Sequence, residues 1–294
     1  MEENTEQRLD LTLFSERIQE LKERIASVVV GQEQTVDLVL TAVLANGHVL
    51  IEGVPGVAKT LLARLTARLI DADFSRIQFT PDLMPSDVLG TTVFNMKTNG
   101  FDFHQGPIFA DIVLVDEINR APAKTQAALF EVMEERQVSI DGTTHRMGEL
   151  YTILATQNPV EQEGTYKLPE AQLDRFLMKI TMDYPSLEEE VNILERHHTN
   201  AALVKLEDVT PVLTKEELLS LRALMSRVFV DRTLLQYIAL IVQQTRTSKA
   251  VYLGASPRAS VAMLQSSKAY ALLQGRDFVT PEDIKFVAPY VLQH

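Results

Sequence analysis

The sequence contains no cysteine, which excludes disulfide bonds and metal sites built on thiolates. It also lacks any apolar run long enough to span a bilayer. The first residues, Met1 to Asn4, are polar and acidic, whereas a secretory signal begins with basic and then apolar residues. These absences predict a protein without a membrane span, and we expect a cytoplasmic location.

A surplus of positive charge is also missing. Lys and Arg number 28 against 40 Asp and Glu, so the formal net charge is −12. Binding DNA irrespective of its sequence requires a basic surface, and this composition therefore disfavours nucleic acid as a partner. With 294 residues, 46% hydrophobic and 23% charged, the composition is that of a globular protein with one large domain or two smaller ones.

The most informative stretch is Gly-Val-Pro-Gly-Val-Ala-Lys-Thr at residues 53–60, with an apolar β-branched run before it and a run of helical spacing after it. A glycine-rich turn between a strand and a helix directs backbone N–H groups and the positive end of the helix dipole toward a phosphate. Lys59 can then contact the β- and γ-phosphates of a nucleotide, and the Thr60 hydroxyl can bind Mg²⁺. The predicted phosphate-binding residues are Pro55, Gly56, Val57, Ala58, Lys59, Thr60 and Leu61.

One residue departs from the usual phosphate-loop pattern. Ala58 occupies the position before the lysine, where glycine is normal. Left-handed backbone costs a residue with a Cβ about 1–2 kcal/mol. We therefore expect a negative φ at Ala58, with its amide still facing the phosphates.

Acidic and amide side chains follow two further predicted strands. Asp116 and Glu117 follow the apolar run 112–115, and Asn158 follows the run 151–156. In a parallel sheet, the carboxyl ends of the strands form the ligand-binding edge. Asp116 is suited to hold Mg²⁺, Glu117 to polarise an attacking water, and Asn158 to orient that water or contact the γ-phosphate. For Asn158 a second interpretation stays open, because Asn before Pro is a common turn.

The order of the predicted elements indicates the fold class. Core strands are predicted at 48–52, 75–80, 112–115, 151–156 and 176–182, helices at 12–28, 123–134 and around 169–175, and β-hairpins at 92–104 and 137–146. From residue 186 onward, helix caps and apolar spacing predict helices alone. The chain is thus predicted to be an α/β protein, with a P-loop parallel-sheet domain at 1–185 and an α-helical lid domain at 186–294.

These motifs, in this order, resemble the AAA+ ATPases and, more closely, the MoxR group of the helix-2-insert clade. The resemblance covers nearly the whole chain, and Ala58 matches MoxR-type proteins. The motifs that carry the resemblance are Gly-Val-Pro-Gly-Val-Ala-Lys-Thr at 53–60, Asp-Glu-Ile-Asn-Arg-Ala at 116–121, Ala-Thr-Gln-Asn-Pro at 155–159 and Leu-Pro-Glu-Ala-Gln-Leu-Asp-Arg-Phe at 168–176.

The resemblance implies roles for individual residues. Asn158 looks like the sensor-1 residue, and Arg258 looks like sensor 2 on the lid. Arg175 looks like an arginine finger that completes the site of a neighbouring subunit, with Arg120 as a competitor for that role. The segment expected to lie against adenine is the turn of Val30, Gly31 and Gln32.

The resemblance also implies a function: Mg²⁺-dependent ATP hydrolysis in a ring, expected to be a homo-hexamer. The energy would drive chaperone-like remodelling or maturation of a protein client, for which a von Willebrand A-type domain is one expected form. Two alternatives stay open, a DNA-acting helix-2-insert motor and a magnesium-chelatase-like motor subunit. A signalling GTPase is disfavoured, because the sequence has no Asn-Lys-x-Asp motif and its C-terminal part is helical.

Overall fold

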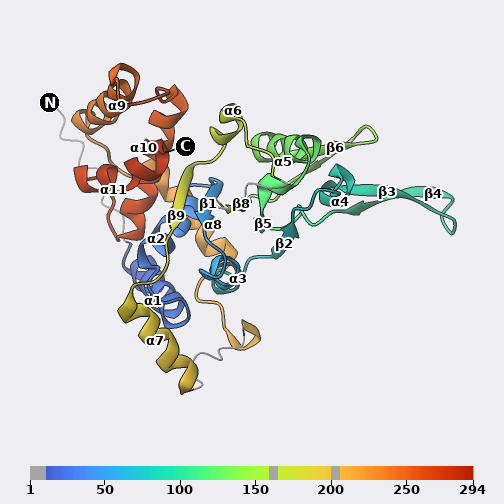
Figure 1. Cartoon of the computed structure of the whole chain (residues 1–294), viewed down its shortest axis with the longest axis horizontal. Helices are drawn as coiled ribbons and strands as arrows, with labels where there is room; N and C mark the ends of the chain where they lie inside the picture. The colour runs from blue at the N-terminus through green and yellow to red at the C-terminus, as the bar shows by residue number, and fades with distance from the viewer. Residues whose placement is uncertain (1–10, 159–164, 200–205, 294) are drawn as a thin grey trace.

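The computed structural model describes residues 11–158, 165–199 and 206–293, whose arrangement Figure 1 shows. At its centre lies a five-stranded parallel sheet in the order β2-β5-β8-β1-β9. The strands are β1 Val49–Gly53, β2 Phe74–Gln78, β5 Ile112–Asp116, β8 Thr152–Gln157 and β9 Met178–Met182. All five predicted strands are present, with ends displaced by no more than two residues, and the predicted α/β fold is confirmed.

Apolar side chains alternate between the two faces of the sheet. In β5, Ile112 and Leu114 belong to one buried cluster, whereas Val113 and Val115 belong to a second cluster on the other face. A parallel strand covered on both sides is apolar throughout, which explains the continuous run at 112–115. The covering elements before β9 are α1 Thr12–Val28, α2 Glu33–Leu44, α3 Lys59–Leu69, α4 Pro85–Leu89, η1 Ile118–Arg120, α5 Ala123–Glu135 and α6 Glu170–Leu173.

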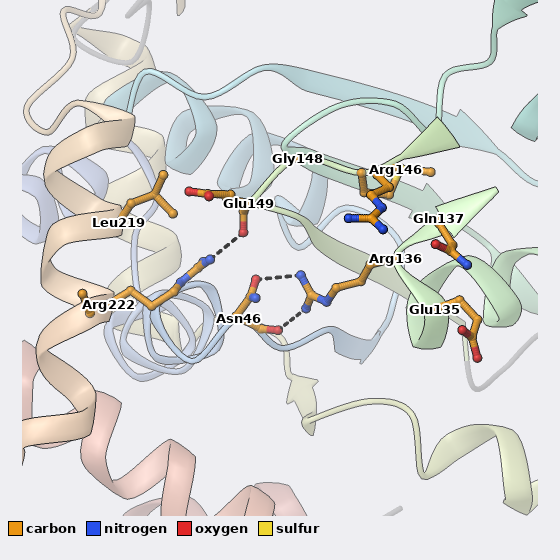
Figure 2. A pocket seen from close by; sticks show the side chains of 11 residues that line it. Asn46, Glu135, Arg136, Gln137, Arg146, Gly148, Glu149, Leu219 and Arg222 are labelled. Atoms are coloured by element: carbon orange, nitrogen blue, oxygen red, sulfur yellow. Dashed lines mark hydrogen bonds between the residues drawn. The ribbon is translucent and has the colours of Figure 1, made fainter. Parts of the chain in front are cut away.

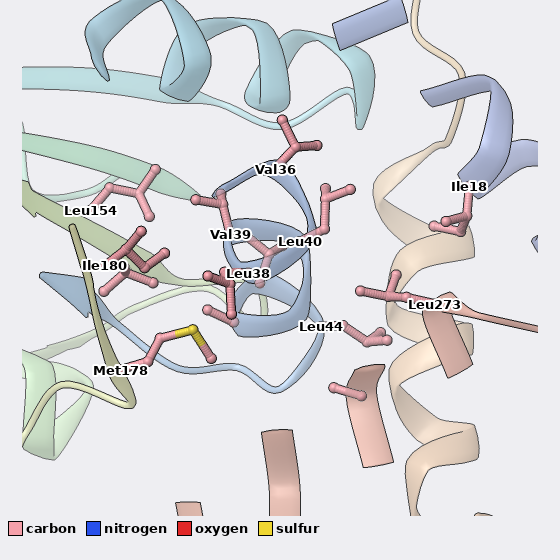
Figure 3. Packing of buried hydrophobic residues seen from close by; sticks show 14 of the residues in the cluster. Ile18, Val36, Leu38, Val39, Leu40, Leu44, Leu154, Met178, Ile180 and Leu273 are labelled. Carbon is pink, nitrogen blue, oxygen red and sulfur yellow. The ribbon is translucent and has the colours of Figure 1, made fainter. Parts of the chain in front are cut away.

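Helix α2 lies at the centre of the larger cluster. All of its residues from Leu38 to Leu44 are buried, because the helix is apolar around most of its circumference. Figure 3 shows α2 between Ile180 of the sheet and Leu273 of the C-terminal helices. The cluster includes side chains from both the 1–185 and the 186–294 stretches, so α2 joins them.

Beyond β9 the described chain is helical, apart from one isolated bridge between Phe229 and Phe278. Ser186 and Thr214 accept hydrogen bonds from the third residues of their helices and form capping boxes, which confirms the helix caps predicted beyond residue 186. None of the described helices is long and apolar enough to cross a membrane. The elements are α7 Leu187–His198, η2 Leu206–Asp208, α8 Lys215–Leu224, η3 Met225–Arg227, α9 Arg232–Thr247, α10 Pro257–Leu273 and α11 Pro281–Leu292.

Two antiparallel hairpins project to the same side of the sheet (Figure 1). The longer pairs β3 Gly90–Asn95 with β4 Gly100–Gln105, and the shorter pairs β6 Gln137–Ile140 with β7 Thr143–Arg146. Asn99 and Asp141 have φ values of 49° in the two turns, as expected for residues that tolerate left-handed backbone. Both predicted hairpins are therefore confirmed.

We predict that replacement of Leu38 by alanine lowers the free energy of unfolding by about 2–5 kcal/mol, because it leaves a cavity in the centre of the core. Leu38 is 1% exposed, whereas Leu13 on α1 is 59% exposed and serves as the matched control. Leu13→Ala should change stability by less than about 0.5 kcal/mol. Urea denaturation followed by circular dichroism compares the two, and equal losses would contradict the central place of α2.

Candidate functional site

The phosphate loop connects β1 to α3. A Cβ on Gly53 would lie 2.8 Å from the carbonyl oxygen of Met182 in β9, so no larger residue fits there. Gly56 turns the chain with a φ of 89°, and the helix begins at Lys59. The Lys59 Nζ donates to the Gly53 carbonyl at 2.6 Å. The ammonium group thus lies across the loop, next to a helix N-terminus that favours a phosphate.

Ala58 contradicts the expected negative φ. Its φ is 62° and its ψ is 22°, which is left-handed backbone at the N-cap of α3. The chain must leave β1 and enter α3 through a short connection, and this closure overrides the local preference of alanine. The side chain packs against the larger apolar cluster, and that burial offsets part of a penalty of about 1–2 kcal/mol.

Asp116, at the end of β5, is 7% exposed and held by two neighbours. The Thr156 hydroxyl of β8 donates to Asp116 Oδ1 at 3.1 Å, and Arg76 Nε of β2 donates to Oδ2 at 2.6 Å. The same hydroxyl accepts the backbone N–H of Glu117 at 3.0 Å. Thr156 therefore fixes both the carboxylate of Asp116 and the backbone that carries Glu117.

Glu117 leaves the strand with a φ of 56°. Its Oε2 accepts from Gln78 Nε2 of β2 at 2.9 Å and pairs with Arg120 Nε at 3.1 Å. The carboxylate is consequently oriented from both sides by groups of its own chain. Arg120, which the sequence left open as a second trans-acting arginine, contacts the acidic residue of its own site.

Asn158 directly follows β8 and is 8% exposed. Strand β8 lies between β5 and β1 and runs parallel to both. The carboxyl ends of the three strands therefore bring the phosphate loop, the acidic pair and Asn158 to one edge of the sheet. This convergence is the arrangement expected from the sequence.

Arg175 lies at the opposite side of the sheet, where the amino ends of the strands meet. It precedes β9, which pairs with β1 so that Met178 is level with Val49 and Met182 with Gly53. The five residues of β9 span about 16 Å at the usual strand rise, and they separate Arg175 from the level of the phosphate loop. Figure 1 shows α6 and α7 at the two ends of this strand.

Arg258 joins Arg175 at that edge. The Glu134 carboxylate, near the end of α5, accepts from Arg175 Nε and Arg258 Nη2, each at 3.0 Å. The hydrogen bond from Arg258 is the largest single cause that lowers the pKa of Glu134, and the charge and hydrogen bond of Arg175 lower it further. Ser256, the N-cap of α10, donates to Asp174 at 3.0 Å. The two arginines predicted for the nucleotide site thus form one cluster, and the phosphate loop lies at the other end of the sheet.

The turn at Val30, Gly31 and Gln32 leads from α1 into α2. Gly31 has a φ of 72°, and a Cβ there would lie 2.4 Å from the carboxyl carbon of Glu189 in α7. The left-handed backbone at this position favours glycine. The first turn of α7 therefore covers the segment that the resemblance assigns to adenine.

Four contacting residues were not predicted from the sequence: Arg76, Gln78, Thr156 and Glu134. Arg76 and Gln78 alternate on β2 and reach across to the end of β5, where Gln78 is in register with Asp116. Polar residues at the end of a strand beside a predicted acidic pair are the available signal. Glu134 had no such signal, because its two partners come from distant parts of the chain.

The residues of this edge suit a magnesium ion that arrives with a nucleotide. Magnesium prefers oxygen ligands and usually binds through one or two protein groups plus phosphates. The Thr60 hydroxyl and the Asp116 carboxylate are such groups. Among the described residues, no cluster of three or more His, Cys, Asp or Glu side chains could hold a metal by itself.

A five-stranded parallel sheet with a phosphate loop after β1, an acidic pair after β5 and a helical C-terminal part defines a nucleotide-binding protein of the AAA+ class. The family described as "ATPase family associated with various cellular activities (AAA)" matches residues 48–178, and the AAA lid domain matches residues 243–294.

Similarity to individual proteins identifies the family within the AAA+ class. The chain is 46% identical to chaperone MoxR1 of Mycobacterium tuberculosis, over 92% of this chain and 73% of that protein. It is 50% identical to the uncharacterized protein YeaC of Bacillus subtilis, over 92% of this chain and 84% of that protein. A crystal structure of a candidate ATPase from Cytophaga hutchinsonii matches with a TM-score of 0.87 and 40% identity, covering 96% and 88% of the two chains. The chain belongs to the MoxR family of AAA+ ATPases, and the resemblance inferred from its motifs is confirmed.

We predict that two substitutions at Ala58 differ in their effect on ATP binding. Ala58→Gly relieves the left-handed strain but loses a packed methyl group and gains unfolded-state freedom, so both stability and ATP affinity should change little. Ala58→Val places a β-branched residue at positive φ, which distorts the loop and should weaken ATP binding at least about tenfold. Titration with a fluorescent ATP analogue measures both. Unchanged affinity in the valine variant would contradict the left-handed geometry.

Proposed function

We propose that this ATPase hydrolyses Mg²⁺-bound ATP at the edge formed by the phosphate loop, Asp116, Glu117 and Asn158. The loop amides and Lys59 bind the phosphates, and Thr60 and Asp116 hold the metal. The ion, when bound, neutralises charge on the phosphate oxygens. The observation that carries this proposal is the shared Thr156 contact, which orders Asp116 and Glu117 beside the loop.

The remaining cis residues have defined tasks in this proposal. Glu117 accepts a proton from, or polarises, the attacking water, and Asn158 orients that water. The adenine ring lies against the turn of Val30, Gly31 and Gln32. Gln78 and Arg120 hold the Glu117 carboxylate before a nucleotide reorganises the edge.

Replacement of Glu117 by glutamine should abolish turnover and preserve ATP binding. The amide cannot act as a base, so kcat is expected to fall by about 10²–10⁴ while the Kd for ATP stays within a few fold. Glu131→Gln, an exposed position on α5, is the matched control and should retain full activity. Normal turnover in the Glu117 variant would contradict the assignment of Glu117 as the base. The same variant, held in its ATP-bound state, also serves to capture client proteins by pull-down.

We further propose that the active form is a ring of identical subunits, taken to be a hexamer, in which Arg175 completes the site of the neighbour. The distance along β9 between Arg175 and the phosphate loop supports this, because an arginine at one edge does not reach a phosphate at the other. Because Arg258 shares the Glu134 carboxylate with Arg175, we assign Arg258 the same role in trans. A trans-acting arginine is worth about 10³–10⁵ in rate.

Mixing variants tests the trans role directly. Lys59→Ala, Arg175→Ala and Arg258→Ala are each expected to be nearly inactive alone. A 1:1 mixture of Lys59→Ala with either arginine variant should regain up to about a quarter of the activity, because head-to-tail contacts rebuild some complete sites.

A mixture of Lys59→Ala with Glu117→Gln is the control and should regain nothing, since both defects lie in the same half of the site. Arg175→Ala that stays fully active alone, or a mixture that recovers nothing, would contradict the trans arrangement.

For the client, we propose a protein remodelled or matured at the expense of ATP. The long hairpin supports this class, because Met96 and Phe101 near its tip are 81% and 73% exposed. Exposed apolar side chains suit contact with protein more than contact with DNA. The relative named chaperone MoxR1 agrees with this class, and a client with a von Willebrand A-type domain is one form of it. Stimulation of ATP hydrolysis by DNA would instead favour a DNA motor, and a chelatase-like partner would show in the pull-down.

A further inference from the structure

A cavity of about 580 Å³ opens between the base of the β6–β7 hairpin and α8 (Figure 2). The end of α2 borders it just before β1, and Tyr151 lies close by, just before β8. The cavity therefore lies at the amino ends of the strands, and the phosphate loop lies at their carboxyl ends. Its lining includes Asn46, Arg136, Arg146, Glu149, Leu219 and Arg222.

Two partly buried arginines hold the end of α2 from either side of this cavity. Arg222 of α8 donates to the carbonyls of Val43 at 2.7 Å, Leu44 at 3.2 Å and Glu149 at 2.8 Å. Arg136 follows α5, and its Nη1 and Nη2 donate to the side-chain and backbone oxygens of Asn46, as the dashed lines in Figure 2 show. The acceptors in these bonds are neutral, so neither guanidinium charge is neutralised by them.

The arginines that line the cavity carry positive charge that no ion pair in the described part of the chain neutralises. Among the described residues, no ion pair includes Arg136, Arg146 or Arg222. Burial lowers the pKa of Arg136, and burial followed by repulsion from Arg136 lowers the pKa of Arg222 to about 10. Glu135 also borders the cavity, but Figure 2 shows its carboxylate directed away from the guanidinium groups. The Glu149 carboxylate attracts Arg222 without forming an ion pair with it, so three guanidinium charges face this one carboxylate. An excess of partly buried positive charge favours the arrival of an anion.

Donors for such an anion remain as well. A guanidinium has five N–H groups. Arg222 uses three of them on the carbonyls above, and Arg136 uses three on Asn46 and Tyr151, which leaves two on each. Arg146 lies at the exposed rim with its guanidinium in the same region (Figure 2). Planar guanidinium groups match the oxygens of a phosphate group in pairs.

We propose that this cavity is a second ligand site, separate from the ATP site, which binds a small phosphate-bearing molecule. Its volume is that of ordinary small-molecule sites, roughly 300–1,000 Å³, and exceeds the need of a water cluster or a single small ion. A doubly charged phosphate group balances the excess of guanidinium charge better than a single carboxylate does. The occupant therefore bridges the hairpin base and α8 through Arg136, Arg146 and Arg222.

Inorganic pyrophosphate is the probe for this site. Calorimetric titration into the Lys59→Ala chain, in which the phosphate loop has lost its cation, should show one bound pyrophosphate per chain. Adding Arg146→Ala, an exposed position whose loss does not disturb the core, should weaken this binding at least about tenfold. Arg222→Lys keeps one charge but removes the fork and should weaken it similarly. Arg232→Ala, an exposed arginine on α9, is the control and should leave the affinity unchanged.

The outcomes are distinct. Absence of binding by pyrophosphate, or equal affinity with and without Arg146, would overturn the site. Binding of citrate in preference to pyrophosphate would overturn the ligand class, because it would indicate a carboxylate site. Circular dichroism of each variant confirms that a loss of binding is not a loss of fold. Because every chain in this test carries Lys59→Ala, its failure would leave the proposed ATP chemistry intact.

Discussion

The common direction of the five core strands is the constraint on which the rest of this protein depends. Because the strands are parallel, every residue that follows a strand lies at one edge of the sheet and every residue that precedes one lies at the other. The phosphate loop, the acidic pair and Asn158 follow strands, whereas Arg175 precedes one. The fold alone therefore separates the phosphate-binding groups from the arginine that the motifs assign to the same chemistry.

Burial of α2 provides the second level of organisation. Its apolar circumference packs on the sheet on one side and on α8 and α10 on the other, so the C-terminal helices are fixed relative to the strands. Arg222 and Arg136 hold the carbonyls at its end. The position of Arg258 follows from this packing, because α10 carries it to the edge where Glu134 and Arg175 lie.

Local signals explain what the sequence could predict. Strand runs, the glycine-rich loop, capping boxes and turn residues depend on near neighbours, and they were found within two residues of their predicted places. Contacts between distant segments were not accessible, which is why Thr156 and Arg76 around Asp116 were missed. Ala58 shows the reverse case, since its local preference predicted the wrong φ and closure of the loop prevailed. The pairing of Arg258 likewise depends on packing that no local pattern encodes.

Helix α5 spans the sheet from one edge to the other. Near its start, buried Gln126 donates to the carbonyls of Ile118 and Ala121 and so ties the segment after Glu117 to the helix. Near its end stands Glu134, which holds both arginines. Thirteen residues make a rod of about 20 Å that transmits a displacement without changing its length. Helix α5 therefore connects the segment that follows Glu117 to the carboxylate that holds Arg175 and Arg258, and it links the two ends of the strands through one rigid element.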